Sequence, residues 1–168
     1  PRKIIRLPDL LAVLALTVTA LIVFWRPIVN GEVFLPLDLL AHMPPWRYSY
    51  ERTPIINPIP SDLLLEYYPR RLIAREMLEA GQLPLWNPYI LGGTPLLADG
   101  NSGLLYPLGV LFWILPLSAA FGWYAFIHLT LAGIGAYLLA RIVGLHTLPA
   151  LLAALVSQWC GFSMTWIV

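Results

Sequence analysis

The sequence predicts an all-α integral membrane protein with three transmembrane helices and a long external loop that contains amphipathic interfacial helices. The first supporting observation is composition. Of 168 residues, 59% are hydrophobic and 11% are charged, whereas a soluble domain of this length carries about a quarter charged residues. The second observation is distribution: every acidic residue except Asp9 falls between Arg26 and Gly103, and the long apolar runs lie outside that segment. Together these observations indicate membrane spans around a polar segment.

The first transmembrane helix is expected over 10–28. A basic segment, 1–9, precedes an apolar run of about 20 residues, which is long enough to cross about 30 Å of hydrocarbon. Asp9 resembles a helix cap, and Pro27 is expected to close the helix. A cleaved signal peptide is the alternative interpretation. No small-x-small cleavage site follows Trp25, so an uncleaved anchor is preferred.

The external loop is expected over 29–103, which is too long for a plain connector and is therefore expected to be functional. Within it, 61–80 predicts a short helix followed by a second one that starts or kinks at Pro69 and ends at Gly81. Apolar residues recur in the second helix at helical spacing, which indicates an amphipathic helix. It either lies flat on the membrane or packs on the rest of the loop. The apolar positions are Leu72, Ile73, Met77 and Ala80.

The remaining segments alternate between spans and short connections. Segment 104–116 is apolar but too short to cross a bilayer, so an interfacial or re-entrant piece is expected. A second transmembrane helix is expected over 117–141, and its small residues would let a neighbouring helix of this or another subunit approach closely. A turn over 142–147 leads to a third transmembrane helix over 148–168. Because the chain begins with Pro and stops inside an apolar run, it is expected to belong to a longer protein.

Orientation follows from the basic residues. The basic N-terminus, 1–9, and Arg141 fall on one side of the expected bilayer, which the positive-inside rule assigns to the cytoplasm. The turn over 142–147 is then cytoplasmic, and the acidic loop over 29–103 is external.

Asp38 and His42 are the first candidate site residues. Asp38 follows the first span closely, and a carboxylate near apolar surface and beside a histidine can be desolvated and act as a base. The alternative is a surface acid that caps the turn after Pro36, and spacing alone favours this alternative.

Asp62 and Glu66 are one helical turn apart, and Arg70 lies a further turn on. Paired acids with arginine can provide a base, a ligand for a divalent metal or a clamp for phosphate, and Arg70 and Arg71 are the candidate phosphate contacts. The alternative is a solvated ionic network at the start of a helix, where acidic residues are favoured by the helix dipole. Spacing alone again favours the alternative.

Trp86 and Asn87, in a Trp-Asn-Pro turn, are candidate substrate contacts. Trp86 is suited either to stacking on a sugar or to the aromatic belt at a membrane interface. Gln158 and His128 lie within predicted spans, where a polar side chain is costly and is most often bonded to another helix.

Several function classes lack support. The net charge of +1 gives no indication of nucleic-acid binding, and the single cysteine cannot form an internal disulfide. The sequence contains no Gly-rich phosphate loop, no Cys/His metal spacing and no nucleophile elbow.

The segment from Ser61 to Phe112 resembles the first large external loop of the YfhO-type bacterial multi-spanning membrane proteins. The pattern of that family is an acid, an aromatic-Pro pair, a G-x-x-P-x-W-N-P turn, a Gly-Gly-x-Pro step and a Tyr-Pro before the next apolar segment. The chain departs from it at Glu66, where the pattern often has Gln. The matching elements are Asp62, Tyr68-Pro69, Gly81 to Pro88, Gly92 to Pro95 and Tyr106-Pro107.

The resemblance implies a multi-pass protein of the bacterial cytoplasmic membrane whose layout is similar to the GT-C glycosyltransferases. Such an enzyme takes a sugar from a polyprenyl-phosphate carrier and transfers it to an acceptor at the external face. By that layout Asp38 is the candidate catalytic acid nearest the first span, and by the YfhO-type pattern Asp62 is the better match. The alternative from a different class is a non-catalytic structural or accessory subunit of a larger membrane complex.

Overall fold

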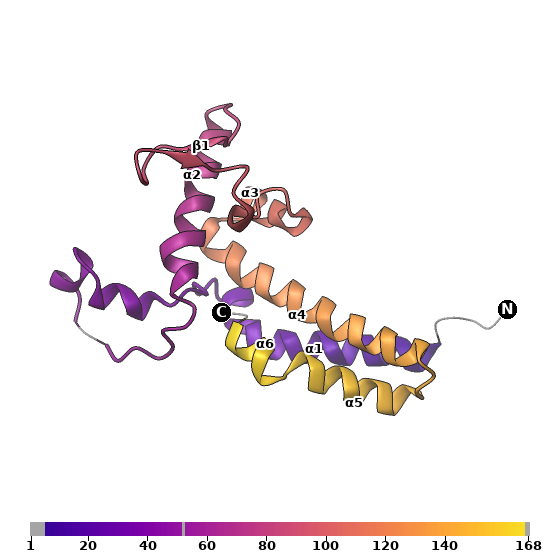
Figure 1. Ribbon diagram of the computed structural model, residues 1–168. Helices are drawn as coiled ribbons and strands as arrows, with labels where there is room; N and C mark the ends of the chain where they lie inside the picture. The colour runs from indigo at the N-terminus through magenta and orange to yellow at the C-terminus, as the bar shows by residue number, and fades with distance from the viewer. Residues whose placement is uncertain (1–5, 52, 167–168) are drawn as a thin grey trace. The chain divides into compact units, whose positions relative to one another are not determined.

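The computed structural model describes residues 6–51 and 53–166, and most of them are helical (Figure 1). Sheet is limited, within these residues, to two paired strands, β1 (Trp86–Asn87) and β2 (Thr94–Pro95). The prediction of a helical fold with three apolar helices of membrane-spanning length is confirmed, and these helices fit a membrane protein. The three candidate spans are Leu7–Val29, Leu117–Ile142 and Thr147–Thr165.

The chain divides into two compact units. Of the described residues, the helical unit comprises 6–32 and 122–166, and the loop unit comprises 33–51 and 53–121. The boundary between them falls within one continuous helix, α4 (Leu117–Ile142).

Helix α1 (Leu7–Val29) differs slightly from its predicted form at both ends. Asp9 lies in the first turn rather than at the cap, and its Oδ2 accepts a hydrogen bond of 2.9 Å from the backbone N–H of Arg6. Pro27 lies inside the last turn and the helix continues to Val29, after which the backbone N–H groups of Asn30 and Glu32 donate to the Arg26 oxygen.

The third candidate span is interrupted, which the sequence did not predict. Helix α5 (Thr147–Gln158) and helix α6 (Gly161–Trp166) are separated by two residues, Trp159 and Cys160. Neither proline nor charge marks this break, and Gly161 is its one local signal.

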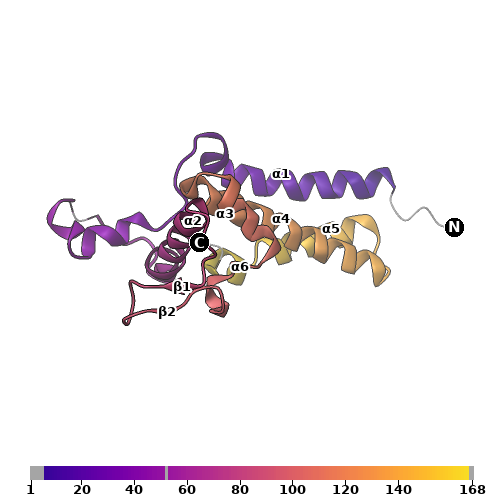
Figure 2. The ribbon, with the colours of Figure 1, turned by 90° about the horizontal axis from the view of Figure 1, so that it is seen from above.

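Small residues hold the helical unit together. Helices α1 and α5 lie side by side in both views (Figure 1, Figure 2). Alanine at the contacts lets helices approach closely, as is typical of packing between helices in a bilayer. The buried core consists of Ala12, Leu16, Tyr137, Ala150 and Ala154.

Gln158 lies fully buried inside this unit and bonds to both other helices. Its Nε2 donates to the backbone oxygens of Leu16 in α1, at 3.2 Å, and Leu129 in α4, at 3.4 Å. Its Oε1 accepts from the Thr19 hydroxyl at 3.5 Å. The sequence predicted that a polar side chain within a span bonds to another helix, and Gln158 does so in the structure. His128 Nδ1 lies 2.7 Å from the backbone oxygen of Tyr124 in its own helix.

A polar cluster joins the start of α1 to the end of α4. Asp9 Oδ1 accepts hydrogen bonds from the Tyr137 hydroxyl, at 2.6 Å, and from Arg141 Nε, at 2.9 Å. Arg6 and Arg141 therefore lie at the same end of the helical unit, while the remaining basic residues of segment 1–9 lie outside the described residues.

Replacing Asp9 by Ala is expected to lower the midpoint of thermal unfolding. The Tyr137 hydroxyl is fully buried and would lose its acceptor, and Arg141 would lose its carboxylate partner. Asp9→Asn keeps an oxygen acceptor and should lose less. The measurement is thermal unfolding in nanodiscs followed by circular dichroism, and an unchanged midpoint for Asp9→Ala would contradict the structural role of this cluster.

The loop unit is built from short elements around one longer helix, α2 (Tyr68–Glu79). Within the described residues, no candidate span falls between Val33 and Pro116. The predicted interfacial segment over 104–116 forms two short helices, η5 (Pro107–Val110) and α3 (Leu111–Ile114). The other elements are η1 (Leu37–His42), η2 (Trp46–Tyr48), η3 (Leu63–Tyr67), η4 (Gly100–Ser102), η5 (Pro107–Val110) and α3 (Leu111–Ile114).

Helix α2 packs on the loop unit itself. Its Ala74 forms a small core with Leu96 and Leu104, and Ile73 and Met77 pack against that core. The helix ends at Glu79, and Gly81 terminates it as predicted, because its φ of 73° lets the backbone N–H of Gln82 reach the Met77 oxygen at 2.8 Å. This packing corresponds to one of the two alternatives for the amphipathic helix, and contact with a membrane stays a prediction.

Candidate functional site

Arg70 lies between two carboxylates. Its guanidinium is 3.3 Å from Glu66 and 3.1 Å from Asp99, and its side chain is largely buried. The structure thus brings together two predicted site residues, Glu66 and Arg70, and adds Asp99, which the sequence analysis missed. Asp99 is the first residue of an Asp-Gly turn, and its Oδ1 accepts from the Asn101 N–H at 3.0 Å. Such a turn predicts local structure but gives no sign of an arginine 29 residues earlier.

Arg71 is buried rather than exposed, with 5% of its surface accessible. Its guanidinium lies over the Phe112 ring, 4.5 Å from the centroid, and Nη2 donates to the Gly103 oxygen at 3.1 Å. Arg75 acts similarly at the next turn, because its Nη1 donates to the Leu115 oxygen at 2.8 Å. The arginines of α2 therefore fasten this helix to the segment that follows the hairpin.

Asp38 and His42 hold a neighbouring stretch of backbone. Asp38 Oδ2 accepts from the N–H of Ile56 at 2.8 Å, and His42 Nε2 lies 2.7 Å from the oxygen of Thr53. Both side chains come from η1, so this helix is attached at two points to the segment 53–56. One carboxylate oxygen of Asp38 is thereby engaged in structure.

Asp62 is exposed at the start of the helical stretch that leads into α2. Among the residues that the structure describes, its carboxylate forms no hydrogen bond or ion pair, in contrast to those of Asp38 and Glu66. Its carboxylate is therefore accessible to a molecule outside the chain.

Trp86 and Asn87 form strand β1 of the hairpin. Asn87 is buried, and its Oδ1 accepts from the Tyr89 N–H at 3.0 Å, so its side chain shapes the turn. Trp86 lies over Gly93, where an added Cβ would approach the indole nitrogen to 2.3 Å. The Trp-Asn-Pro turn is thus ordered by its own side chains.

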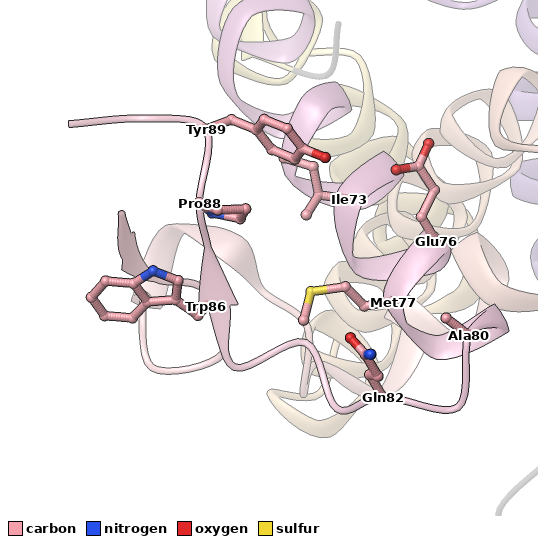
Figure 3. Close-up of a pocket in the computed structure, with 8 residues that line it drawn as sticks. All are labelled: Ile73, Glu76, Met77, Ala80, Gln82, Trp86, Pro88 and Tyr89. Carbon is pink, nitrogen blue, oxygen red and sulfur yellow. The ribbon is translucent and has the colours of Figure 1, made fainter. Parts of the chain in front are cut away.

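A groove of about 410 Å³ lies between α2 and the hairpin. Figure 3 shows Ile73 and Met77 of α2 on one side of the groove and Pro88 and Tyr89 of the hairpin on the other, and Glu76 and Trp86 also line it. The floor is apolar, and Glu76, Gln82 and Tyr89 supply a carboxylate, an amide and a hydroxyl. Aromatic rings beside a few hydrogen-bonding groups suit a polar ring such as a sugar. Of the predicted site residues, Trp86 alone lines this groove, and Glu76 and Gln82 were missed because neither stands in a motif.

The described residues contain no group of side chains that could bind a metal ion. No set of three or more His, Cys, Asp or Glu side chains there is placed to hold an ion. In the Glu66–Arg70–Asp99 arrangement, the guanidinium already pairs with both carboxylates and offsets one of their two negative charges.

Comparison of the chain with protein-family models, with curated proteins and with solved structures finds no match.

Proposed function

We propose that this chain belongs to a YfhO-type membrane glycosyltransferase of GT-C layout, which transfers a sugar from a polyprenyl-phosphate carrier to an acceptor. The observation that carries the proposal is the loop unit, which combines an aromatic and polar groove with the accessible carboxylate of Asp62, in a chain with three candidate spans. In the proposed topology the N-terminus and Arg141 face the cytoplasm of a bacterium, and the loop unit lies outside its inner membrane.

The chemistry requires a base. The proton of the acceptor hydroxyl passes to a carboxylate while the oxygen forms a bond to the anomeric carbon of the sugar. The bond from that carbon to the carrier oxygen breaks, and the polyprenyl phosphate leaves with the electron pair. Asp62 is the better candidate for the base because the Asp38 carboxylate already holds Ile56. His42, which holds Thr53, is then a positioning residue.

Arg70 and Arg71 could bind the carrier phosphate only by giving up contacts that they make in the structure. Arg70 contacts the carrier phosphate only if its guanidinium exchanges Glu66 or Asp99 for the phosphate oxygens. Arg71 would need to leave Phe112 and Gly103, so its main role in the proposal is to position α2. A divalent metal at the phosphate remains compatible with the chemistry, with its ligands unassigned.

Asp62→Asn is expected to reduce sugar transfer by about 10²–10⁴-fold, because the amide cannot accept a proton. The measurement is transfer from radiolabelled polyprenyl-phosphate sugars by the full-length protein in proteoliposomes. Glu79→Gln is the matched control, since Glu79 is an exposed carboxylate of the same unit that pairs with Arg75, and it should retain activity. Full activity in both Asp62→Asn and Asp38→Asn would overturn the mechanism.

The second candidate is a non-catalytic subunit of a membrane complex. It is favoured by the structural use of all three arginines of α2 and by the open surface at Gly135 of α4, where an added Cβ would meet no atom within 4 Å. A wild-type protein that transfers no sugar, and that co-purifies with other membrane proteins in fixed ratio, would support this candidate and overturn the enzyme.

A further inference from the structure

The loop between β1 and β2, Pro88–Gly93, presents apolar side chains outward. This hairpin tip carries Tyr89, Ile90 and Leu91, which are 74%, 40% and 95% exposed. A leucine with almost its whole side chain in water loses the free energy that burial of its apolar surface would provide. The tip therefore has the surface of a segment that contacts something apolar.

The backbone holds these side chains outward. The strands pair Trp86 with Pro95 and Asn87 with Thr94, and the Gly93 N–H donates to the Ile90 oxygen at 2.7 Å. Leu91 has a φ of 52°, a left-handed conformation that leucine rarely adopts. A strained and ordered turn that ends in an exposed leucine is typical of a functional contact rather than of a flexible loop.

The chemistry of the surrounding segment identifies the partner. Segment 80–98 contains no Asp, Glu, Lys, Arg or His, although charged residues flank it at Glu79 and Asp99. Its exposed aromatic residues, Trp86 and Tyr89, are of the types enriched where a membrane meets water. Because the same chain has three candidate spans, a bilayer is an apolar partner available to the hairpin tip.

We propose that the hairpin tip inserts into the interfacial layer of the bilayer that the spans of this chain cross. Tyr89 lies at the level of the headgroups, and Ile90 and Leu91 reach the first part of the acyl chains. The tip is a membrane contact formed by a β-turn, separate from α2 and from the spans. This contact requires no sugar chemistry, so it stands whether or not the proposed transferase activity is found.

The test places one fluorescent label at the tip. In a Cys160→Ser background, Leu91→Cys is labelled with an environment-sensitive fluorophore in the full-length protein in lipid nanodiscs. Glu51→Cys, at an exposed charged position of the same loop unit, is the control. Quenching by iodide in the water should be about fivefold weaker at position 91 than at position 51, because the label leaves the aqueous phase. Lipids that carry a spin label near the headgroup should quench position 91 and leave position 51 bright.

Three results would overturn the proposal. Equal iodide quenching at the two positions would show that the tip stays in water. Protection from iodide without quenching by spin-labelled lipid would show that protein, such as a second copy or another subunit, covers the tip. Tyr89→Cys provides a second labelling position in the same tip and should repeat the result obtained at Leu91, and disagreement between the two would also count against insertion.

Discussion

Arg71→Ala should destabilise the loop unit by about 2–4 kcal/mol, which is the largest effect expected in this unit. The substitution leaves the Gly103 oxygen without the donor that Arg71 supplies, removes the cation over Phe112 and opens a cavity beside both. Hydrogen exchange of segment 99–115, measured by mass spectrometry on the protein in nanodiscs, reports this loss as faster local opening.

Arg75→Ala is the matched control for Arg71→Ala. Arg75 also bonds to the backbone, at Leu115, but its side chain is more exposed, so a smaller loss of about 1 kcal/mol is expected. Equal protection in the two variants would contradict the central role of Arg71. If Arg71→Ala instead weakened binding of the lipid carrier and left the exchange rates unchanged, the phosphate-binding role predicted from the sequence would gain support.

Gly133→Leu should destabilise the helical unit by about 2–3 kcal/mol, because the added side chain overpacks a closed contact. An added Cβ at Gly133 would lie 2.9 Å from Cδ of Gln158, whose amide is fully buried and bonded to Leu16 and Leu129. The amide must move, and its bonds to α1 and α4 weaken with it. Reversible unfolding in mixed micelles measures the change in the free energy of unfolding.

A double-mutant cycle separates this clash from other effects. Gly133→Ala should be costly in the wild-type background and almost without cost in a Gln158→Ala background, which gives a coupling energy of about 1 kcal/mol. Gly135→Ala is the control, since its Cβ meets no neighbour, and it should be neutral or slightly stabilising. A cost for Gly133→Ala that is the same in both backgrounds would show that Gln158 is not the obstacle.

The spans could be predicted from the sequence because apolar length depends only on composition. Runs near Leu10 to Trp25 and Leu117 to Arg141 require no knowledge of what they pack against, and the structure forms α1 and α4 there. The break before α6 could not be predicted in the same way. It interrupts a run that is apolar on both sides, and Gly161 alone does not distinguish a break from a close helix contact.

The candidate site was harder to predict because its geometry depends on contacts between distant segments. Helical spacing placed Arg71 away from the apolar face, yet its partner Gly103 lies 32 residues further along the chain and draws it inward. The spacing of Asp62, Glu66 and Arg70 predicted one ionic network, but among the described residues Arg70 pairs with Glu66 and with Asp99 from another element, and Asp62 takes no part. A single sequence gives residue types and local periodicity, and neither determines which carbonyl a guanidinium reaches.

The position of Gln158 has a consequence for how the chain enters the membrane during synthesis. Of the three candidate spans, Thr147–Thr165 is the least apolar, and it contains this amide and the break between α5 and α6. Its amide acquires acceptors from α1 and α4, both of which are made earlier. The two earlier spans thus provide hydrogen-bond acceptors for the third span inside the lipid. Because they are made first, they help to keep in the membrane the span that partitions into lipid least readily by itself.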